Sequence, residues 1–359
     1  MVTENEIKAQ ELAFANLEAD ENYQMLIGDI RSCVNNIKVT QTNRIRSANR
    51  LQQKADGTAT KNASAVAKII KTSEAFRKFA TDLLKKTLGV EDEFEEYLKK
   101  IIKKHPVYSD WLANVTGVGP ALAGTILSEF RPERIYYVGQ MFSYSGIIGD
   151  TSRKRGTKAN YNTFLKSRLL GVLGESFLKG ESEYAIYYYQ YMCRKLQKYL
   201  NGDEEYRKAN PLARMHRQSV RWMVQRFVKD YYTAWRTIMG FPNIKSYEEE
   251  KLGMVHCGNE WTSFETYYKV HYRVDKATMK KNRKAALAKL DEFHQKVDEL
   301  KIACGFAKNL VELREANPFI KKHPELGAET WTYAEMRKWK EDHGEGRGRK
   351  HKGKSEDEE

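Results

Sequence analysis

Cysteine and proline are scarce in this chain of 359 residues, which has only four of the first and seven of the second. The cysteines lie far apart and form no C-x-x-C pair, so a dense disulfide scaffold is excluded and a zinc site of the usual spacing is disfavoured. The low proline content excludes a collagen-like or proline-rich protein. The chain also lacks a P-loop, a G-x-S-x-G sequence and an H-E-x-x-H sequence, so the enzyme classes marked by those motifs are not predicted.

Long hydrophobic runs and the alternating pattern of β-strands are missing too. The longest uncharged run, from Trp111 to Ser128, is interrupted by Gly117-Val118-Gly119-Pro120 and diluted by polar residues. This pattern favours two buried helix pieces around a turn over a membrane span. No signal peptide is recognisable at the N-terminus. With so few cysteines we expect a reducing, intracellular setting, either cytoplasmic or nucleoid-associated.

Positive charge is the most prominent feature of the composition. Lysine and arginine number 62 against 48 aspartates and glutamates, which gives a formal net charge of +14. A polyanion is therefore the first partner to consider. The chain is 31% charged but also 11% aromatic, and that aromatic content is typical of a folded protein rather than a disordered one. Its length predicts two or three domains with a substantial core.

Apolar residues recur at helical spacing along most of the chain, so the expected fold class is all-α. The predicted helices cover residues 1–52, from about 62 to a C-cap at Gly89, Val90 to Lys104, Pro211 to Met239 after an N-cap at Asn210, and Lys276 to Leu313. We divide the chain into a helical N-terminal region (1–104), a nucleic-acid-binding domain (105–245), a helical C-terminal region (246–342) and a disordered charged tail (343–359).

The acidic cluster from Glu91 to Glu96 is the one candidate for a metal site in the first region. Because carboxylates favour the first turns of a helix, we interpret this cluster as a solvated helix start. A metal site built from His256-Cys257 with His271, His294 or Cys304 would match no known ligand spacing. We therefore predict no metal site and no cofactor.

The most informative stretch is the sequence Gly117-Val118-Gly119-Pro120 between two apolar segments. It predicts a helix-hairpin-helix, in which Val118 packs into the core and Pro120 begins the second helix. Glycines let the backbone approach a phosphate closely, and the free amides at the helix start then point at that phosphate. Such binding would be independent of nucleotide sequence. The alternative is an ordinary packing corner between two helices.

Basic residues downstream extend this candidate interface. The segment from Thr151 to Arg168 carries no acid, and Arg214, Arg217 and Arg221 form a second basic stripe at helical spacing. The six basic residues of the acid-free segment are Arg153, Lys154, Arg155, Lys158, Lys166 and Arg168. Six tyrosines between Tyr184 and Tyr199 follow. Exposed tyrosines can stack on unpaired bases, but for any single one we favour packing in the core.

The motifs of residues 105–178 and their order along the chain resemble those of the C-terminal domain of insertion-sequence transposases of the IS-one-ten type. The matching elements are Gly117-Val118-Gly119-Pro120, Tyr144-Ser145-Gly146-Ile147, Ser152-Arg153-Lys154-Arg155-Gly156 and Phe164 to Leu170. The resemblance implies DNA binding, recombination and transposition by a mobile element. It also implies guidance by a structured RNA, and a nucleophilic serine for which Ser152 is the best match and Thr151 the competitor.

One half of that family pattern is not found in this sequence. Members of the family carry an N-terminal ribonuclease-H-like domain whose four carboxylates hold magnesium, whereas residues 1–104 show no strand pattern and no aspartate after an apolar strand. A serine without a base or metal is a weak nucleophile, so we do not predict catalysis by the isolated chain.

The sequence thus favours a DNA-binding protein related to these transposases. One alternative is an active recombinase that uses Ser152 with magnesium held by a partner chain. The other is a structural or RNA-binding helical protein. The expected partners are DNA, a structured RNA and a second copy of the chain, without a membrane.

Overall fold

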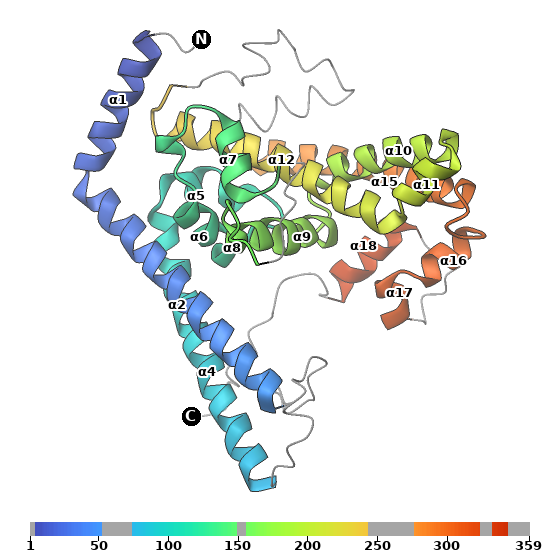
Figure 1. The fold of residues 1–359 in the computed structure, drawn as a ribbon, viewed down its shortest axis with the longest axis horizontal. Helices are drawn as coiled ribbons and strands as arrows, with labels where there is room; N and C mark the ends of the chain where they lie inside the picture. The colour runs from blue at the N-terminus through green and yellow to red at the C-terminus, as the bar shows by residue number, and fades with distance from the viewer. Residues whose placement is uncertain (1–3, 52–73, 149–155, 243–275, 324–331, 344–359) are drawn as a thin grey trace. The chain divides into compact units, whose positions relative to one another are not determined.

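The computed structural model describes residues 4–51, 74–148, 156–242, 276–323 and 332–343. Every regular element in these ranges is helical, and none of them is a strand (Figure 1). The all-α prediction is therefore confirmed. The chain divides into two compact units, the first formed by residues 1–168 with 229–273 and the second by residues 169–228 with 274–359. These units differ from the predicted parts, because residues 1–104 share a unit with the start of the 105–245 segment.

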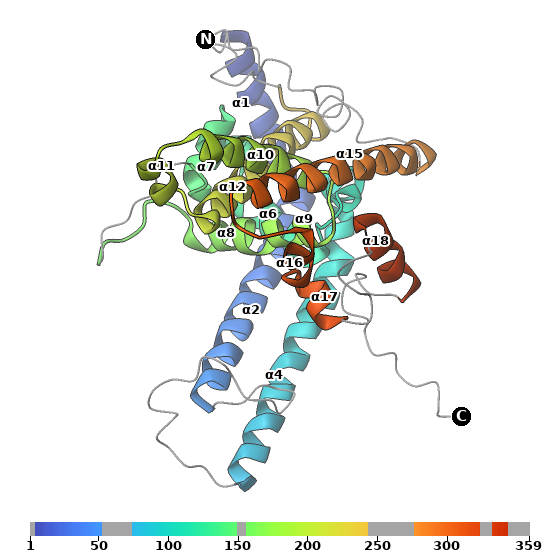
Figure 2. The same ribbon diagram turned by 90° about the vertical axis from the view of Figure 1, so that its right-hand side faces the viewer.

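Three long helices begin the first unit: α1 (Glu4–Ala19), α2 (Glu21–Leu51) and α4 (Glu74–Ile101). Asp20 interrupts the predicted helix over residues 1–52, and its carboxylate accepts a hydrogen bond from the amide of Tyr23 at 3.1 Å, so that it caps α2. Helices α2 and α4 lie side by side (Figures 1 and 2). Ile30 and Val34 of α2 and Leu98 of α4 belong to the same buried cluster, which holds the two helices together.

Helix α4 corrects two of our predictions. We predicted that one helix ends at Gly89 and another begins at Val90, but α4 continues through both residues. The acidic cluster therefore lies in the second half of a long helix and not at a helix start. Within it, Glu91 is buried and paired with Arg44 of α2, so this residue is not a solvated cap. The predicted end at His105-Pro106 is confirmed, after a 3₁₀ turn, η1 (Ile102–Lys104).

Short helices complete the first unit around the last part of α12 (Leu212–Ile238). Trp111, Phe130 and Tyr231 form its aromatic centre, with ring centroids 6.3 Å apart for Trp111 and Tyr231 and 5.8 Å apart for Phe130 and Tyr231. The short elements are α5 (Pro106–Asp110), η2 (Leu112–Asn114), α6 (Pro120–Glu129), η3 (Pro132–Arg134), α7 (Val138–Ser145) and α8 (Thr163–Ser167).

Arg236 of α12 fixes the connection between α6 and α7. Its side chain is fully buried and donates hydrogen bonds to the carbonyl of Ile135 at 3.0 Å and to the side chain of Gln10 at 2.9 Å. Nearby, the Tyr232 hydroxyl donates to the carbonyl of Tyr136 at 2.6 Å. A buried guanidinium is stable when carbonyl and amide oxygens satisfy its donors, so this segment is held in one conformation.

The second unit contains the first part of α12, the helices that directly precede it in the chain and the C-terminal helices. Phe177, Tyr184 and Phe227 form its aromatic centre, with Phe177 and Tyr184 stacked at 5.1 Å. Helix α10 packs along α15 (Figure 2). Besides the π-helical segment η4 (Arg168–Leu173), the elements are α9 (Gly174–Lys179), α10 (Ala185–Asn201), α11 (Glu204–Ala209), α15 (Lys276–Ala303), α16 (Leu310–Glu315), α17 (Pro318–Lys322) and α18 (Tyr333–Asp342).

Partly buried ion pairs join the loop before α10 to the C-terminal helices of this unit. Arg337 of α18 pairs with Glu181 at 3.0 Å and with Asp291 of α15. Arg283 of α15 pairs with Glu183 at 3.2 Å. Burial raises the pKa of Glu181 more than the nearby Arg337 charge lowers it. These contacts fix the C-terminal helices to the loop.

Two further predictions of helix ends are wrong. Helix α15 ends at Ala303, before Gly305, whose φ of 75° lies in the left-handed region, so the expected helix to Leu313 is split. Asn210 does not cap α12; its side chain donates to the Tyr206 carbonyl at 2.9 Å, at the end of α11. The predicted disordered tail lies outside the described residues except for His343. No helix in the described ranges combines the length and apolar character needed to cross a bilayer.

Candidate nucleic-acid interface

The glycine hairpin is a tight turn between η2 and α6. Gly117 has a φ of 94°, in the left-handed region that favours glycine. Val118 is buried, and its amide donates to the Val115 carbonyl at 3.1 Å. The side chain of Val118 thus anchors the turn in the core, and a glycine lies on each side of it.

Helix α6 begins directly after the turn. Gly119 occupies the N-cap position in an extended conformation, Pro120 takes the first helical position, and the amide of Ala123 closes the first helical turn onto the Gly119 carbonyl at 2.9 Å. The amides of Ala121 and Leu122 precede that bond and have no helical acceptor. Gly119 is exposed, and a Cβ atom placed on it would meet no atom within 4 Å. The backbone at the start of α6 is therefore open to a phosphate group.

The rest of α6 packs closely against the helical hairpin of α2 and α4. A Cβ atom on Gly124 would lie 3.0 Å from Leu98 of α4 and 3.3 Å from Val34 of α2. On the other side of the turn, His105 caps α5 by accepting a hydrogen bond from the Val107 amide at 3.2 Å through Nδ1. Burial lowers the pKa of His105 to about 4, so the ring is neutral at pH 7. The hairpin is held on both sides by buried groups.

The basic residues of the acid-free segment differ in their exposure and contacts. Lys158 is exposed, whereas Lys166 lies 4.3 Å from the centre of the Tyr161 ring. Arg168 is half-buried and donates to the Gln41 side chain of α2 at 2.7 Å, so this contact already engages its guanidinium. Ser152, Arg153, Lys154 and Arg155 lie outside the described residues.

The second basic stripe belongs to the second unit, while the hairpin belongs to the first. Arg214 and Arg217 are exposed on α12, and Arg221 is half-buried. Arg214 donates to the Ala209 carbonyl at 2.9 Å. The predicted site residues thus do not form a single cluster within one unit.

The tyrosine-rich segment is mainly structural, as we favoured. Tyr184, Tyr187 and Tyr188 are buried in the second unit. The Tyr188 hydroxyl lies 2.8 Å from Nδ1 of His216. Tyr191 stacks on Trp222, with ring centroids 5.4 Å apart. These contacts explain most of the aromatic content of α10 as core packing.

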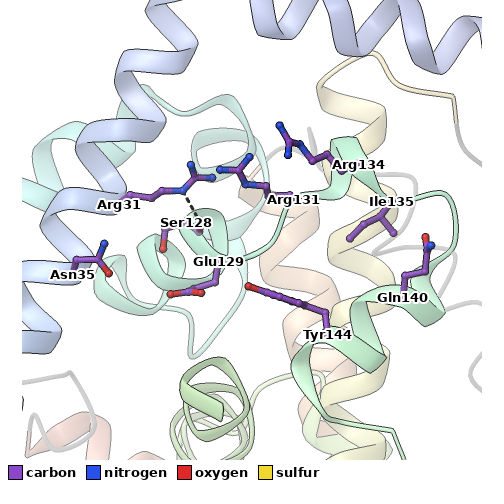
Figure 3. Close-up of a pocket in the computed structure, with 9 residues that line it drawn as sticks. All are labelled: Arg31, Asn35, Ser128, Glu129, Arg131, Arg134, Ile135, Gln140 and Tyr144. Atoms are coloured by element: carbon purple, nitrogen blue, oxygen red, sulfur yellow. Dashed lines mark hydrogen bonds between the residues drawn. The ribbon is translucent and has the colours of Figure 1, made fainter. Parts of the chain in front are cut away.

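A pocket lined by arginines, which sequence reasoning missed, lies beside the C-terminal end of α6 (Figure 3). Its volume is about 530 Å³. Arg31 comes from α2, Arg131 and Arg134 come from the segment after α6, and Tyr144 of α7 lies across from them. The only sequence signal is the pair of arginines that follows α6, because Arg31 is distant in the chain.

Two of these arginines lie close enough to repel each other. The Nε atom of Arg31 donates to the Ser128 carbonyl at 3.1 Å, and Figure 3 shows its guanidinium next to that of Arg131. Burial, followed by the Arg131 charge, lowers the pKa of Arg31 from its ordinary value. Arg134 pairs with Glu18 at 3.4 Å on the surface. Among the described residues, Glu129 is the one carboxylate that lines the pocket. The Glu133 carboxylate lies nearby, and the charges of Arg131, Arg134 and Arg31 lower its pKa, although burial raises it more.

Metal coordination is not indicated in the part of the chain that the structure describes, where no three histidine, cysteine, aspartate or glutamate side chains gather in a ligand-like group.

Comparison of the chain with protein-family models, curated proteins and solved structures gives no match. The resemblance to IS-one-ten-type transposases therefore stays a prediction, and the functional argument depends on the geometry of the chain itself.

Proposed function

We propose that this protein binds the phosphate backbone of DNA without strong sequence preference, as a relative of insertion-sequence transposases. The observation that carries the proposal is the exposed start of α6, where Gly119 leaves open space over the first amides of the helix. The net charge of +14 and the acid-free segment from Thr151 to Arg168 support it. Contacts to the DNA backbone do not distinguish one base from another, so we expect a weak sequence preference.

Anisotropy of a labelled DNA duplex, titrated with the full chain from low to high salt, tests this proposal. Each neutralised phosphate releases counterions, so the affinity should fall along a linear log–log plot, with a slope of roughly −0.9 per contact. Changing Arg153, Lys154 and Arg155 together to alanine should make that slope shallower by up to about three. Absence of binding at the lowest salt concentration would refute the proposal. A structured RNA used as competitor identifies whether RNA is the preferred partner.

Recombination by Ser152 is the second candidate function, and its support is the order of motifs around Tyr144-Ser145-Gly146 and Ser152. We expect no cutting or joining of DNA by the purified chain, because a base or a metal-binding carboxylate cluster is not recognisable beside Ser152 in the sequence. Incubation with supercoiled plasmid and magnesium tests this. Nicking that disappears in Ser152→Ala would make the chain a recombinase, whereas nicking that persists would exclude Ser152 as the nucleophile.

We also propose that the protein forms a homodimer through α4. Five apolar side chains on this helix are between 42% and 62% exposed, and they follow one another at spacings of three, four, seven and seven residues. This spacing is typical of a coiled-coil seam. The residues, which we call the α4 row, are Phe76, Phe79, Leu83, Val90 and Tyr97.

Charge along α4 favours an antiparallel arrangement of the two copies. The first half of the helix carries four basic residues and two acids, whereas the second half carries the acidic cluster. The basic residues are Arg77, Lys78, Lys85 and Lys86, and the acids are Glu74 and Asp82. Parallel copies would place like charges side by side, while antiparallel copies place the basic half of each beside the acidic half of the other. The proposed partner is therefore a second copy of this chain.

A further inference from the structure

The pocket beside α6 has the composition of a nucleotide-binding site. A volume of about 530 Å³ lies in the usual range of small-ligand sites. Among the described residues, three arginines and one carboxylate, Glu129, line it, and the charges of the same arginines also act on nearby Glu133. Three positive charges against these two carboxylates leave an excess of positive charge. Arginine is the side chain best suited to hold a phosphate, since its planar fork donates two parallel hydrogen bonds. The pocket thus has the polarity that a phosphate requires.

Arg131 is the group that most requires a ligand. Its guanidinium makes no hydrogen bond with any residue in the described part of the chain, although it is half-buried and lies beside Arg31. The charge of the nearby Glu133 carboxylate offsets part of the repulsion between the two arginines. Arg31 uses Nε for the Ser128 carbonyl, which leaves its two terminal nitrogens for another acceptor. A phosphate between these two guanidinium groups would relieve their repulsion and satisfy their free donors.

Tyr144 provides the second feature of such a site. Its ring is 44% exposed, lines the same pocket and packs against Phe130, with centroids 6.5 Å apart. Its hydroxyl accepts a hydrogen bond from Asn162 at 3.1 Å, and Asn162 also donates to Glu129 at 2.6 Å. An exposed ring fixed in this way is a stacking surface for a base, and a carboxylate beside it can accept from an exocyclic amino group.

The walls of the pocket are held before any ligand arrives. Arg236 and Tyr232 of α12 bind the carbonyls of Ile135 and Tyr136, and Arg31 binds that of Ser128. Gln140 accepts hydrogen bonds from the amides of Tyr136 and Tyr137 at 3.0 and 3.2 Å. Because these bonds fix the backbone that carries Arg131 and Tyr144, little conformational entropy is lost on binding.

We infer that this pocket binds one nucleotide unit, with its phosphate between Arg31 and Arg131 and its base stacked on Tyr144. The inference deepens the proposed function, because a strand held by the hairpin would be the source of that nucleotide, either a strand end or an unpaired position. A free nucleoside monophosphate offers the same chemistry and is the second source to test.

Calorimetric titration of the full chain at low salt tests the inference with nucleoside 5′-monophosphates, the matching nucleosides and inorganic phosphate. The monophosphates should bind more tightly than either nucleosides or phosphate alone, since only they engage both the arginines and the ring. Equal binding of inorganic phosphate would overturn the assignment of a nucleotide, as would the absence of binding by the monophosphates. Oligonucleotides with and without a 5′-phosphate then distinguish a strand end from a free nucleotide.

Two variants with matched controls locate the binding. Arg131→Gln should weaken monophosphate binding at least about ten-fold, while Arg46→Gln, at an exposed arginine of α2 outside the pocket, should leave it unchanged. Tyr144→Leu should weaken binding about five-fold or more and Tyr144→Phe much less, because phenylalanine retains the stacking surface. Arg131 makes no hydrogen bond with the described residues, and its one favourable interaction that the replacement weakens is with the charge of nearby Glu133, so circular dichroism of the variant checks that the fold is retained. Unchanged binding in Arg131→Gln would overturn the inference.

The hairpin provides the remaining control. Gly119→Val should weaken duplex binding and leave binding of monophosphates intact, because the pocket and the hairpin use different residues. If duplex binding is absent and monophosphates still bind, the proposed function fails and the pocket inference stands. If duplex binding occurs without monophosphate binding, the proposed function stands and the inference fails.

Discussion

Arg44 of α2 and Glu91 of α4 form a two-bond ion pair between neighbouring helices. The Nε atom of Arg44 donates to Oε1 of Glu91 at 2.5 Å, and Nη2 donates to Oε2 at 2.9 Å. The Glu91 side chain is only 4% exposed and that of Arg44 20%. The hydrogen bond to Glu91 raises the pKa of the Arg44 guanidinium above its ordinary value. The pair fixes the register of α2 against α4, since neither side chain can slide by one turn without losing both bonds.

Removing Arg44 should destabilise the first unit strongly. In Arg44→Ala the buried carboxylate of Glu91 has no counterion, and the free energy of unfolding should fall by about 3–5 kcal/mol, as for other broken buried pairs. Chemical denaturation followed by circular dichroism measures the change. Lys8→Ala is the control, because its pair with Glu4 is exposed and should contribute less than about 1 kcal/mol. An equally small effect for Arg44→Ala would show that the pair does not fix the two helices.

His105 should make the first unit sensitive to acid. Burial lowers its pKa in the folded state to about 4, against about 6.5 when unfolded. Well above pH 6.5 the ring is neutral in both states, so its titration does not change the stability. As the pH falls from about 6.5 to about 4, the unfolded state takes up the proton first, so stability should decrease by about 3 kcal/mol in total.

Denaturation midpoints measured across that pH range test the role of His105. His105→Asn keeps a side-chain acceptor for the Val107 amide but removes the titrating ring, so its stability should depend less on pH than that of the original chain. The comparison uses the pH slope, because the smaller side chain also lowers stability at neutral pH. Burial also lowers the pKa of His294 in the second unit to about 3. Some pH dependence of stability therefore remains in His105→Asn. An identical slope in both proteins contradicts the prediction.

The hairpin was predictable from sequence because its determinants are local. Gly117 needs a positive φ, Val118 needs a core to enter, and Pro120 suits the first position of a helix, so a few adjacent residues encode the turn. The same reasoning failed at Gly89. A glycine inside a helix costs only about 1 kcal/mol, and the packing of buried Leu84 and Leu98 on both sides of it outweighs that cost.

The arginine pocket was not predictable, because its residues meet only through the tertiary fold. Arg31 and Ser128 are 97 positions apart in the chain and come together only because α2 packs against α6. The burial of Glu91 has the same origin, since its partner Arg44 lies 47 positions away. Helical periodicity identified the elements, but it cannot show which charged side chain of one helix faces which of another.

Leu83→Lys should abolish self-association through the α4 row. A charge in the middle of an apolar seam would be desolvated on dimer formation, which strongly disfavours the complex. Sedimentation velocity should show a dimer for the original chain and a monomer for the variant. Met25→Lys is the matched control, because Met25 is also an exposed apolar residue but lies on α2 outside the row. A monomer at all concentrations for the original chain would exclude the proposed dimer.

The two hairpin glycines should respond differently to the same substitution. Gly119 has a φ of −80°, and a Cβ atom there meets nothing within 4 Å, so valine fits the folded chain. Gly117 has a φ of 94°, where a β-branched side chain is strained. Gly119→Val should therefore leave the fold nearly as stable, at a cost of about 1 kcal/mol or less for the altered cap. Gly117→Val should lower stability by about 1–3 kcal/mol.

Binding then distinguishes a phosphate contact from a packing corner. If the start of α6 holds a phosphate, the side chain of Gly119→Val occupies the space of that phosphate, and duplex affinity should fall about ten-fold or more despite the intact fold. Gly28→Ala, at an exposed glycine of α2 with equally open surroundings, is the control and should bind like the original chain. Wild-type affinity in a folded Gly119→Val variant would mean that the hairpin only packs two helices. The basic stripe of Arg214, Arg217 and Arg221 would then be the next surface to test.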